Sequence, residues 1–375
     1  MDERYLECFS LRTLYEIFGV DPSQAVRRLV YKARAMRRGE VLAPLLLSVA
    51  AREGHALGSG SSDEIARARQ RVATYDAVWR DLASRWDCQL VKGPTIARHY
   101  PPDVVRPVGD LDIVVDGEET LWQVVARVQE LCPVRRLDLA VFGADEGHHF
   151  AVGLSWPSAD PLLDMNHYVE VNTFGYMGDS QRVGLRLDVP QDTAMANVVA
   201  LAEERFQREF GAKDALDLVA LMASGALDDV EAVVAVAESW LVAPELLELL
   251  RYVASHASLA HVVDRDLLEA LEKPARAERE RRATGTGLDR PGADVPRHVM
   301  PRSRAGGLAL RRTTYRSGQP EAVFREFDGL TLMHCPVGDF LVAQGGKLDA
   351  AAYRAAREHV RQDRSWWRTS TPDER

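Results

Sequence analysis

Two aspartates open a run of branched apolar residues in the stretch Arg106-Pro107-Val108-Gly109-Asp110-Leu111-Asp112-Ile113-Val114-Val115. Because successive side chains of a strand point to opposite faces, a strand over 110–116 would put Asp110 and Asp112 on one face and the apolar residues on the other. Two carboxylates on one face raise each other's pKa unless a positive charge lies between them. The usual partner is a divalent cation with oxygen ligands, most often Mg²⁺, so the stretch predicts a metal site. The alternative is a turn residue followed by a solvated strand residue.

A short turn precedes this strand and is typical of a phosphate site. We expect residues 89–92 to form a strand, Gly93 the turn, and Pro94 the first position of a helix that ends near residue 100. Unpaired backbone N–H groups of a first helical turn favour an anion, and glycine lets that anion approach the backbone. Lys92 and Thr95 would add a charge and a hydroxyl. An ordinary strand-to-helix turn is the alternative, but the Asp-x-Asp strand that follows favours a phosphate cradle beside a metal site.

A third carboxylate is expected downstream, because two-metal phosphoryl transfer needs enough anionic ligands to hold both ions. Residues 167–174 have the pattern of a strand, with the valines on one face and Tyr168, Glu170 and Asn172 on the other. Glu170 is therefore the candidate. Asp164 is a second candidate if the strand begins earlier.

Together, these motifs resemble the DNA polymerase β-type nucleotidyltransferase superfamily, and within it the group known as uncharacterised nucleotidyltransferases. That group is similar in having a Leu-Lys-Gly turn, a helix that ends in Tyr-Pro, and an Arg-x-x-Gly/Ser-Asp-x-Asp segment that enters an apolar strand. The counterparts here are Leu90-Val91-Lys92-Gly93, Tyr100-Pro101 and residues 106–115. Where many members have an acidic-apolar-His strand, this chain has Glu170-Val171-Asn172. The resemblance covers roughly residues 70–225.

A further match is the Lys-Asp-x-x-Asp-Leu pattern of residues 213–218, which is similar to the helix that follows the core of small-molecule nucleotidyltransferases. In that setting Lys213 would approach the triphosphate, and a solvated helix position is the alternative. Asp214 and Asp217 are expected to be structural, pairing within the helix or capping it. Arg106 would stabilise the transition-state charge or pair with Asp110.

The resemblance implies an enzyme, a Mg²⁺-dependent nucleotidyltransferase that moves an NMP from an NTP to a hydroxyl or other nucleophile of a small molecule or peptide. Two Mg²⁺ ions are expected, with Mn²⁺ as a substitute, and ATP is the expected donor. Bacterial specialised metabolism is the expected setting. The implied catalytic residues, which are also the metal ligands, are Asp110, Asp112 and Glu170. The implied nucleotide-binding residues are Lys92, Gly93, Thr95, Arg106 and Lys213.

Two other hypotheses stay open. In the first, the fold binds nucleotide or a partner without transfer, and the asparagine that stands in place of the histidine favours this. In the second, the fold has been repurposed for a different biosynthetic reaction.

Composition narrows the partners. The chain has 375 residues and a net charge of −9, which argues against a broad nucleic-acid surface, since such a surface is basic. The most apolar run, residues 41–51, is too short to span a bilayer, so no membrane partner is expected. The four cysteines lack the Cys-x-x-Cys spacing of a zinc site, and no signal peptide is evident. We therefore expect a cytoplasmic protein.

The expected fold class is α+β, with a polymerase β-like core of mixed sheet and helices, helical flanks and a small C-terminal α/β segment. Five regions are expected. They are an N-terminal helical region (1–85), the catalytic core (86–190), a helical bundle (191–272), a basic linker (273–316), and a C-terminal hairpin and helix (317–375). The linker is expected to be solvated, with an arm for a phosphate-bearing or acidic partner as the alternative.

Overall fold

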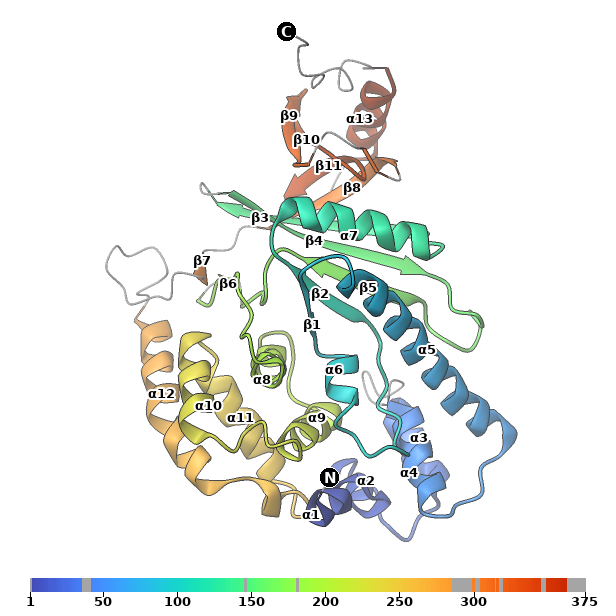
Figure 1. The fold of residues 1–375 in the computed structure, drawn as a ribbon, viewed down its shortest axis with the longest axis vertical. Coiled ribbons are helices and arrows are strands. Elements are labelled where there is room, and N and C mark those ends of the chain that lie inside the picture. The colour runs from blue at the N-terminus through green and yellow to red at the C-terminus, as the bar shows by residue number, and fades with distance from the viewer. Residues whose placement is uncertain are drawn as a thin grey trace. The chain divides into compact units, whose positions relative to one another are not determined.

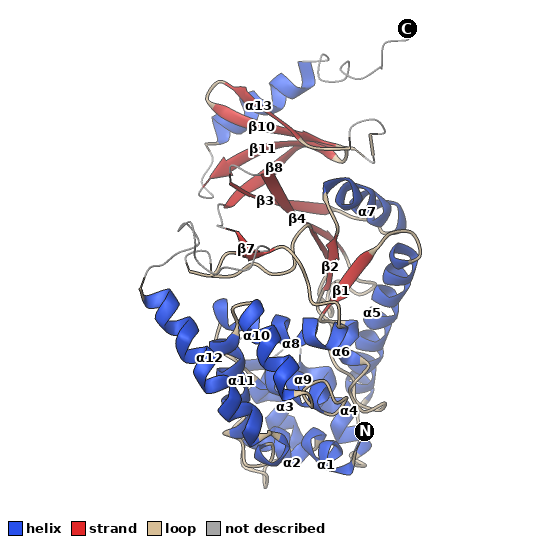
Figure 2. Cartoon of the chain, turned by 60° about the vertical axis from the view of Figure 1, so that its left-hand side comes forward, coloured by secondary structure: helices blue, strands red, loops and turns tan. Residues whose placement is uncertain are grey.

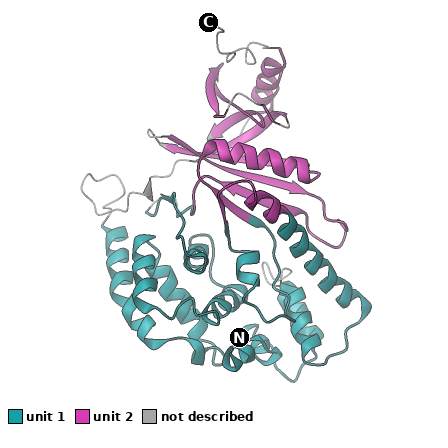
Figure 3. Cartoon of the chain, in the orientation of Figure 1, with its two compact units in different colours: residues 1–77, 90–111, 176–300 teal, residues 78–89, 112–175, 301–375 magenta. Residues whose placement is uncertain are grey.

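The computed structural model describes residues 2–35, 42–144, 147–179, 182–284, 299–300, 304–313, 315–316, 320–344 and 349–362. The chain forms two compact units, each built from three separate segments (Figure 3). Unit 1 comprises residues 1–77, 90–111 and 176–300, and unit 2 comprises residues 78–89, 112–175 and 301–375. Each unit is described by itself below.

Unit 1 is mainly helical (Figure 2). Its helices are α1 (Glu3–Leu6), α2 (Leu11–Ile17), α3 (Val26–Ala35), α4 (Ala43–Arg52), α6 (Pro94–Ala97), α8 (Thr193–Glu203), α9 (Ala212–Met222), α10 (Val230–Ser239), α11 (Ala243–Ala254) and α12 (Arg265–Ala283). Helix α5 (Ser59–Ala83) begins in unit 1 and ends in unit 2. Short 3₁₀ helices cover Glu7–Phe9, Glu204–Phe206 and Ala260–Val262, and β6 (Leu185–Arg186) pairs with β7 (Val299–Met300).

A large mixed sheet dominates unit 2 (Figure 1). Its strands, in spatial order, are β1 (Cys88–Val91), β2 (Leu111–Val115), β5 (His167–Asn172), β4 (Gly147–Trp156), β3 (Arg136–Ala144), β8 (Arg304–Arg312), β11 (Gly338–Gln344), β10 (Leu330–Cys335) and β9 (Val323–Phe327). From β5 to β9 every neighbouring pair is antiparallel. The unit boundary runs through β1 and falls after the first residue of β2.

The two faces of the sheet differ in character, as the alternation of side chains requires. On one face, α7 (Glu118–Leu131) packs on β4 and β5, and the Trp122 ring lies 5.2 Å from the ring of Phe150. Val169 and Val171 are buried on β5, whereas Glu170 between them is only half-buried. The face that carries Glu170 is therefore the polar face of this part of the sheet.

The C-terminal hairpin agrees with the sequence. Asp328 and Gly329 form the turn between β9 and β10, and both have positive φ values, 48° and 73°, as favoured hairpin turns require. Helix α13 (Ala350–Gln362) then packs Ala356 and Val360 against buried leucines of the sheet.

The prediction of a linker over 273–316 is wrong for two of its segments. Helix α12 continues to Ala283, although Pro274 lies inside it. A proline removes one helical hydrogen bond, but the buried face continues across it, from Leu267 and Leu271 to Ala275 and Glu278. Packing against α11 outweighs the proline. Residues 285–298, which hold much of the expected basic arm, lie outside the described residues.

The second segment is β8, which pairs with both β3 and β11. In this strand, a Cβ at Gly307 would lie 2.5 Å from Leu139 Cδ2 on the neighbouring strand. Glycine is therefore needed here for close packing within a strand.

The α+β class, with a large mixed sheet and many helices, is confirmed at this coarse level. The polymerase β-like core and, apart from the linker, the division into regions stay predictions. Within the described part of the chain, every helix is either too short or too polar to cross a bilayer.

Candidate functional site

The Lys92-Gly93 turn has an uncommon backbone that several contacts hold in place. Lys92 has φ +58° and Gly93 φ +50°, and a non-glycine residue adopts such values at a cost. The Lys92 N–H donates to Asn197 Oδ1 at 2.8 Å, and the Lys92 carbonyl accepts from the Thr95 N–H at 3.0 Å. The Gly93 carbonyl accepts from Arg106 Nη1 at 3.0 Å. Such an over-determined turn is typical of a functional site.

The turn lies against the start of the Asp-x-Asp segment. A Cβ built on Gly93 would lie 3.3 Å from the carbonyl oxygen of Asp110 and 3.5 Å from Val108 Cγ1. The neighbouring Gly109 carbonyl accepts from the hydroxyl of Tyr75 on α5 at 2.8 Å. The structure therefore brings the two motifs together, as the sequence suggested, with Asp110 exposed beside the turn.

Thr95 is used by the turn itself. Its side chain is buried, and its hydroxyl lies 2.7 Å from the Lys92 carbonyl and 3.0 Å from Asn197 Oδ1. A phosphate would have to compete with these contacts for the hydroxyl, so its expected role as a phosphate donor stays a prediction.

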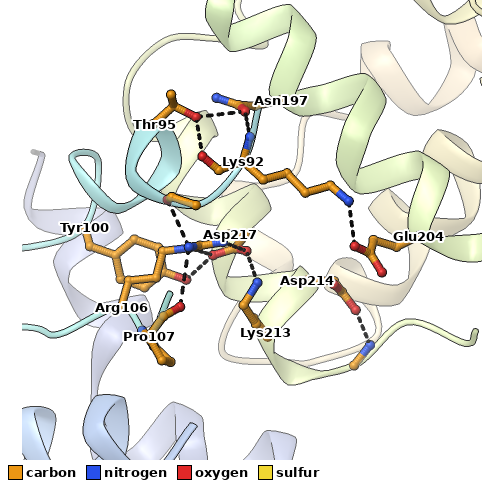
Figure 4. A network of polar contacts seen from close by, with 12 residues as sticks. Lys92, Thr95, Tyr100, Arg106, Pro107, Asn197, Glu204, Lys213, Asp214 and Asp217 are labelled. Carbon is orange, nitrogen blue, oxygen red and sulfur yellow. Dashed lines mark hydrogen bonds and ion pairs between the residues drawn. The ribbon is translucent and has the colours of Figure 1, made fainter. Parts of the chain in front are cut away.

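Arg106 pairs with Asp217 and not with Asp110 (Figure 4). Its Nε and Nη2 donate to the two Asp217 oxygens at 2.6 and 2.7 Å. The same carboxylate accepts from the Tyr100 hydroxyl at 2.6 Å and from Lys213 Nζ at 3.1 Å. We call Tyr100, Arg106, Lys213 and Asp217 the Asp217 network. The expectation that Asp217 is structural is confirmed.

Burial and charge set the titration of this network. Burial alone would raise the pKa of Asp217, but the Arg106 guanidinium and the Lys213 ammonium outweigh it and hold the pKa well below its usual range. The pKa of the Tyr100 hydroxyl is raised by burial and by the Asp217 carboxylate. Asp217 therefore stays ionised and Tyr100 stays protonated at neutral pH, as the hydrogen bond between them requires.

A second set of charges lies beside the first and faces solvent more. Lys92 Nζ lies 2.6 Å from Glu204 Oε1, and Arg208 Nη2 lies 3.0 Å from Glu204 Oε2. Arg208 is also paired with Asp214, which accepts from the Gly211 N–H at 2.8 Å and so caps α9. The capping role expected for Asp214 is therefore confirmed. We call Lys92, Glu204, Arg208 and Lys213 the cation cluster.

Glu170 and its neighbours form an acidic face in unit 2. Glu170 Oε1 accepts from Asn172 Nδ2 at 3.1 Å, and Oε2 accepts from the Tyr168 hydroxyl at 3.4 Å. Burial raises the pKa of Tyr168, and the carboxylates of Glu170, Asp138 and Asp112 add to that rise. These three acidic groups and Tyr168 therefore lie near one another. The Asn172 amide therefore fixes one oxygen of Glu170.

Strand register explains how Asp138 joins this face. Asp138 on β3 is opposite Gly153 on β4, and Gly153 is opposite Glu170 on β5. A Cβ at Gly153 would lie 2.0 Å from the Tyr168 hydroxyl oxygen, so the tyrosine ring lies across the gap that the glycine leaves. We call Asp112, Asp138, Tyr168, Glu170 and Asn172 the Glu170 face.

The expected metal ligands are placed in part. Asp112 and Glu170 belong to unit 2, and Asp110 belongs to unit 1. Among the described residues, no three side chains of the His, Cys, Asp or Glu type are grouped as a metal would need them. Asp164, the second candidate, lies in the loop before β5, where it accepts from the Met165 N–H at 2.9 Å. The metal site stays a prediction on Asp110, Asp112 and Glu170.

Sequence reasoning missed four residues that the structure adds: Asp138, Asn197, Glu204 and Arg208. The alternation Arg136-Leu137-Asp138-Leu139 could have placed Asp138 on the polar face of its strand. Asn197 and Glu204 carry no such signal, because their partners are more than a hundred positions away in the sequence.

Comparisons with known proteins add little. No protein-family model matches the chain, and no curated protein is significantly similar to it. The crystal structure of JHP933 from Helicobacter pylori is similar over 58% of this chain and 94% of that chain, with 13% sequence identity and a TM-score of 0.27. A similarity at that score supports no conclusion about fold or function.

Proposed function

We propose that this protein is a Mg²⁺-dependent nucleotidyltransferase that moves an NMP, from ATP in the first instance, to a hydroxyl of a small molecule or peptide. The observation that carries the proposal is the packing of the strained Lys92-Gly93 turn against the backbone of Asp110, the residue that opens the Asp-x-Asp segment. A phosphate-binding turn beside a pair of carboxylates is an arrangement that phosphoryl transfer requires.

The proposal gives a role to each of the residues that the motifs single out. The Lys92 and Lys213 ammonium groups would bind the triphosphate, and Arg106 would hold the turn through the Gly93 carbonyl. Asp110, Asp112 and Glu170 would hold two Mg²⁺ ions. Carboxylate oxygens are the ligands that Mg²⁺ prefers.

The reaction would proceed by direct displacement. The acceptor oxygen attacks the α-phosphorus, the bond from that phosphorus to the oxygen bridging the β-phosphate breaks, and pyrophosphate leaves. Glu170 accepts the proton of the acceptor hydroxyl, since its carboxylate is held by two neutral donors. When bound, Mg²⁺ lowers the pKa of the attacking hydroxyl and neutralises charge on the phosphates.

The test compares two aspartates of one segment. Asp112→Asn is expected to lower pyrophosphate release from ATP by at least about 10³-fold and to abolish Mg²⁺-dependent ATP binding by calorimetry, with an unchanged melting temperature. Asp116→Asn, the same change at an exposed position just after β2, is expected to behave as wild type. Full turnover in the Asp112 variant would refute the proposal.

A second candidate, nucleotide binding without transfer, is favoured by one observation. The carboxylates among the described residues are not grouped as a metal would need them. In that case ATP would bind in calorimetry with little dependence on Mg²⁺, and no pyrophosphate would appear with any hydroxyl acceptor offered.

A further inference from the structure

Three cations of unit 1 converge on one carboxylate. Lys92 and Arg208 are paired with the two oxygens of Glu204, and the charge of Lys213 also acts on it. Burial alone would raise the pKa of Glu204. The lysines and Arg208 outweigh this effect and lower its pKa to about 2, so the group stays ionised at neutral pH.

The charges are arranged in two layers. Behind, Arg106, Asp214 and Asp217 have side chains only 2%, 2% and 0% exposed. In front, the side chains of Lys92, Arg208, Lys213 and Glu204 are 20%, 23%, 31% and 16% exposed. The rear layer has one positive and two negative charges, and the front layer has three positive and one negative. Without Glu204, the front would present three cations and no anion.

The rear carboxylates hold two of these cations in place from behind. Asp214 binds both terminal nitrogens of Arg208, and Asp217 binds Lys213. Arg208 and Lys213 therefore do not depend on Glu204 for their position. Glu204 begins the 3₁₀ turn that follows α8, and its two oxygens pair with Lys92 and Arg208.

We propose that the cation cluster is a polyphosphate site in which Arg208 is a third phosphate-binding residue and the Glu204 carboxylate occupies the position of a phosphate until one binds. The proposal rests on the proposed function for the identity of the ligand, a nucleoside triphosphate. Carboxylate and phosphate oxygens accept the same hydrogen bonds, and the planar guanidinium of Arg208 suits either. Binding is then an exchange of one anion for another.

Because the ligand replaces Glu204, removing the charge of Glu204 should strengthen the binding of the ligand. A carboxylate that only supported the fold would weaken binding when removed. A carboxylate that competes with the ligand would strengthen binding when neutralised, because Lys92 and Arg208 would no longer have to give up a charged partner.

The experiment titrates sodium tripolyphosphate into the full-length protein by calorimetry, without divalent metal. Glu204→Gln is expected to bind about tenfold more tightly than wild type, and Arg208→Met about tenfold more weakly, the change expected for one charge interaction. The matched controls are Arg205→Met and Glu248→Gln, which should leave the affinity unchanged. Arg205 follows Glu204 in the sequence, and it forms a solvent-accessible ion pair with Glu248. Arg208→Lys, which keeps the charge but not the planar fork, should lie between wild type and Arg208→Met.

Two results would overturn the proposal. One is an unchanged or weaker affinity in Glu204→Gln. The other is an equal affinity in Arg208→Met and Arg205→Met. If Arg208→Met unfolds, an affinity of Arg208→Lys equal to that of Arg205→Met would overturn the proposal in the same way. Failure of the proposed enzyme activity is a separate outcome, because Asp112→Asn and pyrophosphate release do not enter this titration.

Discussion

The Asp217 network of unit 1 and the Glu170 face of unit 2 treat charge in opposite ways. Asp217 is fully buried and accepts hydrogen bonds from two cations and a phenol. Glu170 is half-buried, accepts from a phenol and an amide, and shares its face with two further carboxylates. In the first region the buried carboxylate is fully paired with cations and needs no ligand to be stable. The second gathers charge of one sign, which a bound cation would relieve.

The largest expected effect on stability comes from a substitution in the Asp217 network. Arg106→Ala would leave Asp217 buried without its main partner, and we expect the free energy of unfolding to fall by about 3–5 kcal/mol. Urea denaturation measures this. Arg251→Ala, which breaks an exposed pair with Glu272, should cost no more than about 1 kcal/mol. Equal losses in the two variants would mean that burial does not distinguish these pairs.

A smaller effect tests the turn that Arg106 holds. Gly93→Ala would place a Cβ 3.3 Å from the Asp110 carbonyl at a residue with φ +50°, and we expect a loss of about 1–3 kcal/mol. Gly19→Ala has the same kind of backbone, φ +58°, but no atom within 4 Å of the new Cβ. It should therefore cost less, and thermal unfolding of both variants separates crowding from backbone strain. A larger loss in Gly19→Ala would contradict the close approach to Asp110.

Acid unfolding should reveal the contribution of Glu204, the carboxylate of the cation cluster, to the stability of the fold. The pKa of Glu204 is lowered from 4.5 to about 2 in the folded state. A lowered pKa stabilises the fold above the unfolded value, and that contribution is lost as the pH falls from about 4.5 to about 2. Wild type should therefore lose stability more steeply over this range than Glu204→Gln. Parallel curves of unfolding free energy against pH would show that Lys92 and Arg208 do not lower this pKa.

The smallest expected effect on stability concerns the Glu170 face. Glu170→Gln removes one of several like charges and keeps an oxygen that can accept from Asn172. We expect a change within about 1 kcal/mol, toward greater stability if any. The same substitution at Glu203, which is buried against Arg186 and accepts from the Gly178 N–H, should be strongly destabilising. A fall of more than about 2 kcal/mol in the free energy of unfolding of Glu170→Gln would show that the Glu170 carboxylate is paired with a positive charge.

Local patterns predicted much of the fold. Strand β5 begins at His167 and helix α6 at Pro94, as expected, and the predicted C-terminal hairpin is formed by β9 and β10. Each of these depends on side-chain periodicity or turn chemistry within a few residues. Strand β8 escaped prediction because Gly307 within it is explained by Leu139, a residue on a strand far away in the sequence.

The residues of the candidate site likewise fall into those that local patterns predict and those that depend on distant partners. The motifs gave Lys92, Gly93, Asp110, Asp112 and Glu170, since each lies at a turn or on an alternating strand. The partner of Arg106 could not be found from spacing, because Asp217 is 111 positions away. Glu204 was missed for the same reason, so the sequence predicted Lys92 and Lys213 of the cluster without Arg208 and without the carboxylate that pairs with Lys92 and Arg208.

The order of strands in the sheet affects how the chain folds while it is being synthesised. Strand β3 ends at residue 144, and its neighbour β8 begins at residue 304. At a synthesis rate of roughly 5–20 residues per second, β3 emerges from the ribosome on the order of ten seconds before β8 exists. During that interval the growing chain has an open strand edge, which is a template for unwanted pairing with another nascent chain. We therefore expect expression of chains truncated before residue 304 to yield aggregates, while the complete chain depends on chaperones during this wait.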